Sequence, residues 1–151
     1  MVAVAIILIA LIGTSNFRYY TALGIRKVTA QTEASRLALL LCEDWRGIQG
    51  DLSYDPITFL GDDLEISLYE TADYPEDFNL LGSYVIQLDS DDLQDRKNAY
   101  NINYYATLLY KDIEPGLRAL NVVIAWKQKE TNSEAIDSTD KTYSLTLYTL
   151  L

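Results

Sequence analysis

The chain has 151 residues, nearly half of them apolar, and a net charge of −10, so it is long enough for one folded domain with a core. It contains no histidine and a single cysteine, Cys42. These facts exclude Ser-His-Asp and Cys-His catalytic arrangements, histidine metal ligands and an internal disulfide. Most of the negative charge lies in residues 43–95, where fifteen acidic side chains accompany Arg46 alone. Acidic surfaces repel phosphate backbones, so we expect no nucleic-acid partner.

The N-terminal segment is fully apolar. Residues 1–13 read MVAVAIILIALIG, and a helix over residues 1–17 would span ~25 Å, slightly less than the ~30 Å hydrocarbon core of a membrane. Three interpretations compete: a cleaved secretory signal, a buried helix of a soluble domain, and a transmembrane helix whose beginning lies upstream. The first is disfavoured because the segment has no basic start and no small-residue cleavage pattern. The predicted membrane or filament-core positions are Val2, Val4, Ile6, Ile7, Leu8, Ile9, Leu11 and Ile12.

The helical pattern continues beyond the apolar segment. No proline interrupts residues 19–48, and apolar residues recur there at three- and four-residue steps from residue 23 to residue 48. The opposite side carries the polar residues Arg26, Gln31, Glu33 and Arg36. We therefore predict one helix to about Arg46, ~70 Å long, apolar at first and amphipathic later, with Gly47 and Gly50 as its stop. The domain boundary falls at residue 50: a helix over 1–50 and an acidic β-rich head over 51–151.

The head carries five strand patterns. Apolar and polar residues alternate, or β-branched and aromatic residues cluster, over residues 64–69, 83–88, 101–110, 120–127 and 142–150. Turn signals separate them, including Glu114-Pro115-Gly116. One long helix followed by consecutive strands predicts an α+β fold with an antiparallel sheet of four to five strands. We expect the helix to pack on this sheet through Leu37, Leu41 and Trp45.

Candidate chemistry in the head is sparse. The acidic run Asp89–Asp95 offers oxygen ligands for calcium, but Leu93 and Gln94 break the EF-hand pattern, so we favour a solvated loop. Cys42 falls in an apolar helical stretch, which predicts a buried structural thiol. The chain has twelve tyrosines, and those from Tyr69 onward fit half-buried positions in or beside strands, with a subunit contact surface as the alternative. No phosphate-binding glycine loop is present, so we expect no enzyme, no metal and no cofactor.

An apolar start that passes without a break into an amphipathic helix, and then into an acidic β domain, resembles the type IV pilin and pseudopilin superfamily. The string MVAVAIILIALIG is similar to the apolar part of the prepilin cleavage and methylation segment, which in that family follows a basic leader, a glycine, a methylated Phe-like residue and a glutamate. Those residues are absent here, so we expect the native reading frame to extend upstream of Met1. The strings NVVIAW and SLTLYT resemble the closing hairpin of minor pilins.

The resemblance implies a structural subunit, either a minor pilin or a type II secretion minor pseudopilin. Such a subunit is inserted in the inner membrane with its head in the periplasm, and it assembles with other pilin-like subunits through its apolar helix. Small residues at Ala3, Ala5, Ala10 and Gly13 permit close helix approach. The basic residues after the apolar segment, taken literally, would instead place the head in the cytoplasm. The alternative function is a membrane-tethered module that binds a ligand through its head.

Overall fold

The computed structural model describes residues 28–61, 64–70, 74–88, 102–127 and 140–151. By its internal contacts the chain divides into two units, residues 1–32 and residues 33–151. Within the first unit, the described residues 28–32 are helical, and Thr32 donates a hydrogen bond from its hydroxyl to the Val28 carbonyl at 2.8 Å. The second unit contains the described part of the head.

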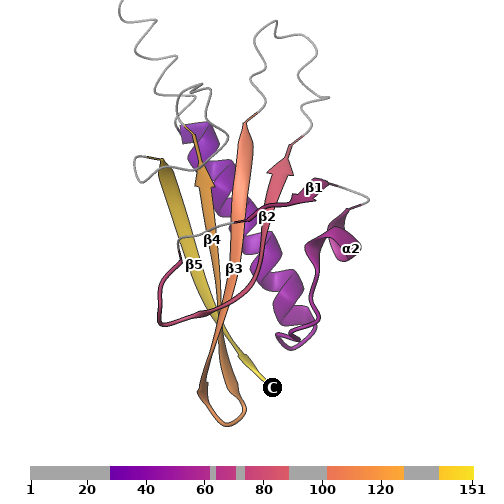
Figure 1. Cartoon of the computed structure of the whole chain (residues 1–151), viewed down its shortest axis with the longest axis vertical. Coiled ribbons are helices and arrows are strands. Elements are labelled where there is room, and N and C mark those ends of the chain that lie inside the picture. The colour runs from indigo at the N-terminus through magenta and orange to yellow at the C-terminus, as the bar shows by residue number, and fades with distance from the viewer. Residues whose placement is uncertain (1–27, 62–63, 71–73, 89–101, 128–139) are drawn as a thin grey trace, which may run out of the picture. The chain divides into compact units, whose positions relative to one another are not determined.

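Five strands form one antiparallel sheet in simple chain order, β1-β2-β3-β4-β5 (Figure 1). Their bounds are β1 (Glu65–Leu68), β2 (Asn79–Gln87), β3 (Asn103–Glu114), β4 (Leu117–Trp126) and β5 (Lys141–Leu150). Each strand pairs with its sequence neighbour, which short connections favour. The predicted antiparallel sheet is confirmed.

β2 begins four residues before the predicted strand at Ser83. A bulge between Leu80 and Gly82 interrupts its pairing with β3, and beyond the bulge Asn79 pairs with Tyr110. A Cβ atom at Gly82 would lie 2.7 Å from the Tyr84 hydroxyl, so only glycine fits this bend without movement of the ring. The sequence prediction began the strand too late because the alternation of apolar and polar residues is broken at Gly82. Glycine is common at such bulges.

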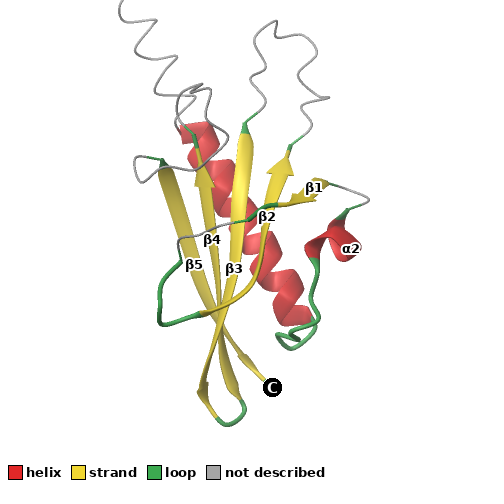
Figure 2. Cartoon of the chain, viewed as in Figure 1, coloured by secondary structure: helices red, strands yellow, loops and turns green. Residues whose placement is uncertain are grey.

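A helix over residues 28–47 precedes the sheet, and within the second unit its residues 33–47 pack along one face of the sheet (Figure 2). The buried side chains of residues 33–47 recur at three- and four-residue steps, and none is more than 4% exposed. They are Ala34, Leu37, Ala38, Leu41, Cys42 and Trp45. The sheet presents to the helix the buried residues Tyr104, Ala106 and Leu108 of β3 and Leu120, Val122 and Ile124 of β4. We call this side of the sheet the helix face.

The opposite side, which we call the open face, is covered unevenly. Near the centre, the Tyr69 ring stands edge-on to Tyr105 at 5.1 Å, and the Lys111 ammonium lies 5.9 Å from the centre of the Phe78 ring. Leu109 on β3 is fully buried there. On β5, in contrast, the open-face residues Thr142, Ser144, Thr146, Tyr148 and Leu150 are all exposed.

A short helix, α2 (Pro56–Leu60), lies between the long helix and β1, where no helix was predicted. Asp55 caps it: its side chain accepts a hydrogen bond from the Ile57 amide at 3.1 Å and another from the Thr58 hydroxyl at 3.0 Å. Pro56 occupies the first helical position, where its missing N–H is harmless. The Asp-Pro pair was therefore a helix start signal as well as a turn signal.

Candidate functional site: the helix end and its anchor on the sheet

The long helix ends where the chain turns back toward the sheet. The Gly50 amide donates to the Trp45 carbonyl at 3.0 Å, and Gln49 and Gly50 both have positive φ angles, of 59° and 68°. A Cβ atom at Gly50 would lie 2.8 Å from Thr149 Cγ2 and 3.1 Å from Leu120 Cδ2. Gly47 remains helical, and a Cβ atom there would meet nothing within 4 Å. Of the two glycines predicted to end the helix, Gly50 is the one whose close contact with Thr149 and Leu120 leaves no room for a side chain.

Arg118 connects this helix end to the sheet. It lies on β4 with only 8% of its surface exposed, and its Nη1 donates to the Gly50 carbonyl at 2.8 Å. Its Nε and Nη2 donate to the two Asp112 carboxylate oxygens at 2.6 and 3.3 Å, and its guanidinium carbon lies 5.2 Å from the centre of the Tyr110 ring. The hydrogen bonds from Arg118 lower the pKa of Asp112. One buried cation thus holds the helix end, the hairpin and an aromatic ring together.

The sequence analysis did not single out Arg118, although a signal was available. Asp112 and Arg118 flank the predicted Glu114-Pro115-Gly116 turn at similar distances, and in the sheet they are register partners across β3 and β4. An opposite-charge pair at such positions is typical of neighbouring cross-strand residues. The contact to Gly50, which lies 68 residues away in the chain, had no sequence signal.

An aromatic cluster secures the segment that follows the helix. The Trp45 and Tyr54 rings stack with centroids 5.9 Å apart, and Phe59 of α2 lies 5.5 Å from Tyr54. Trp45 Nε1 donates to the Asp51 carbonyl at 2.8 Å, and the Tyr54 hydroxyl donates to Asp44 Oδ2 at 2.8 Å. Burial and the Asp44 contact raise the pKa of Tyr54. Trp45 Nε1 and the Tyr54 hydroxyl therefore each have a hydrogen-bond partner, which stabilises the fold of this segment.

The predicted helix-to-sheet residues Leu37, Leu41 and Trp45 are 4%, 0% and 0% exposed. Cys42 lies among them, fully buried, and its Sγ is 3.8 Å from the Leu145 carbonyl oxygen. Burial raises the pKa of the Cys42 thiol to about 12, so the nucleophilic thiolate does not form at neutral pH. The predicted membrane or filament-core residues, Val2 to Ile12, lie outside the described residues.

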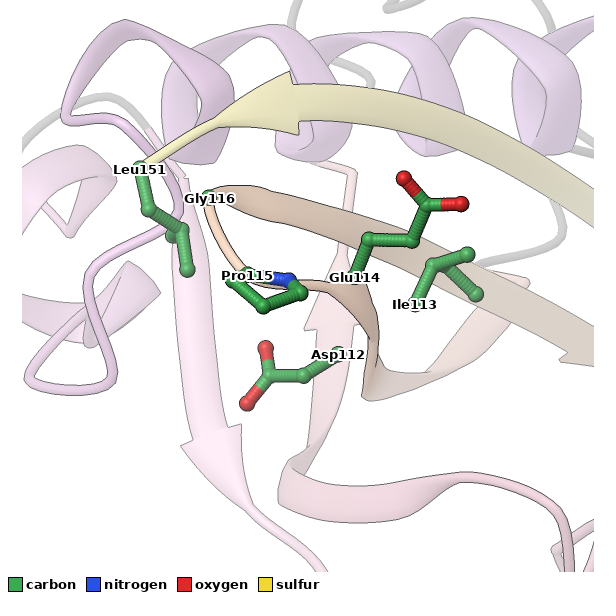
Figure 3. Close-up of a pocket in the computed structure, with 6 residues that line it drawn as sticks. All are labelled: Asp112, Ile113, Glu114, Pro115, Gly116 and Leu151. Carbon is green, nitrogen blue, oxygen red and sulfur yellow. The ribbon is translucent and has the colours of Figure 1, made fainter.

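The described residues hold no group of three side chains suited to bind a metal. The acidic run 89–95, considered above for calcium, lies outside them. A shallow hollow at the β3–β4 turn is lined by Asp112, Ile113, Glu114, Pro115, Gly116 and Leu151 (Figure 3). Figure 3 shows the carboxylates of Asp112 and Glu114 pointing away from each other, and Arg118 already engages Asp112. The hollow therefore lacks the converging polar groups of a ligand site.

In comparisons with known proteins, no protein-family model, no curated protein and no solved structure matches this chain. Within the part of the chain that the structure describes, no helix is both long enough and apolar enough to cross a membrane.

Proposed function

We propose that the chain is a structural filament subunit of the type IV pilin class, either a minor pilin or a minor pseudopilin. The observation that carries the proposal is one helix whose buried stripe is covered by a simple antiparallel sheet, preceded in sequence by a fully apolar stretch. On this proposal the helix continues upstream through the apolar stretch, which the sheet would leave uncovered. The uncovered stretch would enter lipid before assembly and a bundle of like helices afterwards.

Anchoring of the helix end fits a role in load transfer. In a filament held together by its central helices, force between the helix and the head passes through the point where they join. Arg118, Gly50 and the Trp45–Tyr54 stack make that junction from several independent contacts. Head-to-tail stacking of such subunits is a heterologous contact, which generates filaments rather than closed rings.

Membrane insertion is the first test. The chain is expressed in a bacterial host, and its partition between membrane and soluble fractions is measured for the unmodified chain, for Leu8→Arg and for Leu40→Arg. Leu40 is 42% exposed on the described helix and serves as the matched control. Because a charge at the centre of an apolar span costs ~2.5–3.5 kcal/mol, Leu8→Arg should shift the chain to the soluble fraction, while Leu40→Arg should not. An unmodified chain found in the soluble fraction contradicts the proposal.

Orientation and assembly are tested separately. Alkaline phosphatase is active only outside the cytoplasm, so activity of a fusion after Leu151 supports a periplasmic head. Absence of activity supports a cytoplasmic head, as the positive-inside rule predicts from the basic residues after the apolar segment. Sheared surface filaments are then probed for the chain. A chain that stays in the membrane and never enters filaments would favour the alternative, a tethered module that binds a ligand through its head.

A further inference from the structure

We propose that β5 is a docking edge for β5 of a second copy of this chain, paired antiparallel about a two-fold axis near Leu145 and Thr146. β5 has ten residues and pairs with β4, and no other described strand lies beside it. Every second residue of an edge strand turns its backbone N–H and C=O outward, and this row of groups is a template for another extended strand. Such a dimer can form whether or not the chain belongs to a filament.

Apart from Lys141 at its start, the side chains of β5 lack the usual protection of an edge strand. Natural edges are shortened, bulged, or guarded by charged residues and proline. Residues 142–151 contain no charge and no proline, and the β4–β5 pairing runs without a bulge. The opposite edge, β1, has only four residues, begins with Glu65 and is followed by Glu70. β1 pairs with residues 84–87 of β2, so the start of β2 is also an unpaired edge, but a bulge between Leu80 and Gly82 interrupts it. Among the described strands, β5 is therefore the long edge without a bulge.

Charge opposes a second copy less at this edge than over the rest of the surface. The chain has a net charge of −10, so two copies repel each other over most of their surface. The β5 segment, residues 141–151, carries Lys141 and no acidic side chain. Antiparallel pairing places the two Lys141 ammonium groups at opposite ends of the shared ribbon, ~30 Å apart, whereas parallel pairing would set them side by side.

Side-chain size favours the same arrangement. On the open face, the small residues Thr142 and Ser144 occupy one end of β5, while Tyr148 and Leu150, 61% and 75% exposed, occupy the other. With the axis at Leu145 or Thr146, Tyr148 of each copy faces Thr142 or Ser144 of the other. The large exposed side chains then pack over small ones, and aromatic contact with β-branched or hydroxyl residues across strands is favourable.

The first experiment measures self-association of the full chain in mild detergent by sedimentation velocity, from micromolar to near-millimolar concentration. Thr146→Lys places like charges opposite or diagonal to each other at the axis, and it should weaken dimerisation at least about tenfold. Leu68→Lys, on the exposed β1 edge, is the matched control and should leave dimerisation unchanged. An equimolar mixture of Thr146→Lys and Thr146→Glu should dimerise again, since opposite charges now face each other.

The second experiment needs no variant and decides the matter if the Thr146 variants fail to fold. Amide hydrogen exchange of the unmodified full chain is followed at low and at high protein concentration. Exchange in β5 should slow as concentration rises, while exchange in β1 should not change. A chain that stays monomeric throughout, or a dimer that Thr146→Lys does not weaken, overturns the proposal. Protection of β5 at all concentrations also overturns it, because another segment of the same chain would then cover the edge.

Discussion

Arg118 on β4 donates a hydrogen bond to the carbonyl of Gly50 at 2.8 Å, although 68 residues separate them in the chain. The carbonyl belongs to the turn that ends the long helix, where backbone acceptors have no helical partner. A guanidinium suits this position because its planar fork can serve Gly50 and Asp112 together. The direction in which the chain leaves the helix is therefore fixed by a residue of the sheet.

Arg118→Met should destabilise the fold by about 2 kcal/mol, because it leaves the buried Gly50 carbonyl without its donor. Asp112→Asn should cost clearly less than Arg118→Met, because 56% of the Asp112 side chain is exposed and its ion pair is screened by solvent. Urea unfolding of both variants measures the difference. Equal losses would show that the ion pair, and not the contact with Gly50, anchors the helix end.

Gly50→Ala and Gly47→Ala should have opposite effects. At Gly50 the new Cβ atom approaches Thr149 Cγ2 at 2.8 Å in a backbone with positive φ, so we expect a loss of about 1–3 kcal/mol. At Gly47 the helix is exposed and nothing lies within 4 Å of a Cβ atom, so alanine should add up to about 1 kcal/mol. Thermal unfolding of the two variants tests the pair, and a destabilising Gly47→Ala would contradict this account of the helix stop.

Leu41 and Leu40 are neighbours in the helix with opposite environments, at 0% and 42% exposed. Leu41→Ala should cost about 2–5 kcal/mol, since it removes buried methyl groups from the helix–sheet contact and leaves a cavity. Leu40→Ala should stay within about 0.5 kcal/mol. Chemical denaturation of the two variants checks the assignment of the buried helix face, and similar losses at both positions would contradict it.

Cys42 should make the fold sensitive to alkali. Its pKa is about 12 in the folded chain, against an ordinary value of 9.0, so above pH 9 the unfolded chain binds fewer protons than the folded one. Stability is therefore full below pH 9 and falls as pH rises from 9 toward 12, by at most ~1.4 kcal/mol per pH unit. Burial also raises the pKa of Tyr104 to about 12, which adds a loss of the same sign above pH 10.

The control for this prediction is Cys42→Ala. The variant should be slightly less stable at neutral pH because of the small void, and its stability should be nearly flat between pH 9 and pH 10. Unfolding free energies across that range distinguish the two proteins. An unmodified chain whose stability does not fall between pH 9 and pH 10 would show that the thiol ionises as easily in the folded state as in the unfolded one.

The helical and strand segments of the described chain were readable from sequence because their spacing is local. Leu37, Leu41 and Trp45 share one side of a helix whatever surrounds them, and the alternation in residues 142–150 already separates Tyr143 and Leu145 from Ser144 and Thr146. The sheet followed from the order of the strands. The short helix α2 was missed because Asp55-Pro56 fits a turn as well as a helix start.

The sequence by itself determined which side chains share a face, because helix and strand periodicity depends only on neighbours along the chain. Only the tertiary structure decided which residues from distant parts of the chain meet, and which strand lies at the edge of the sheet. It placed Gly50 against Thr149 and Leu120, seated Arg118 beneath the helix end, and made β5 the long edge of the sheet. Each of these contacts joins residues that are far apart in the sequence. Local residue spacing does not predict such contacts, because they form only when the strands pair and the helix packs on the sheet.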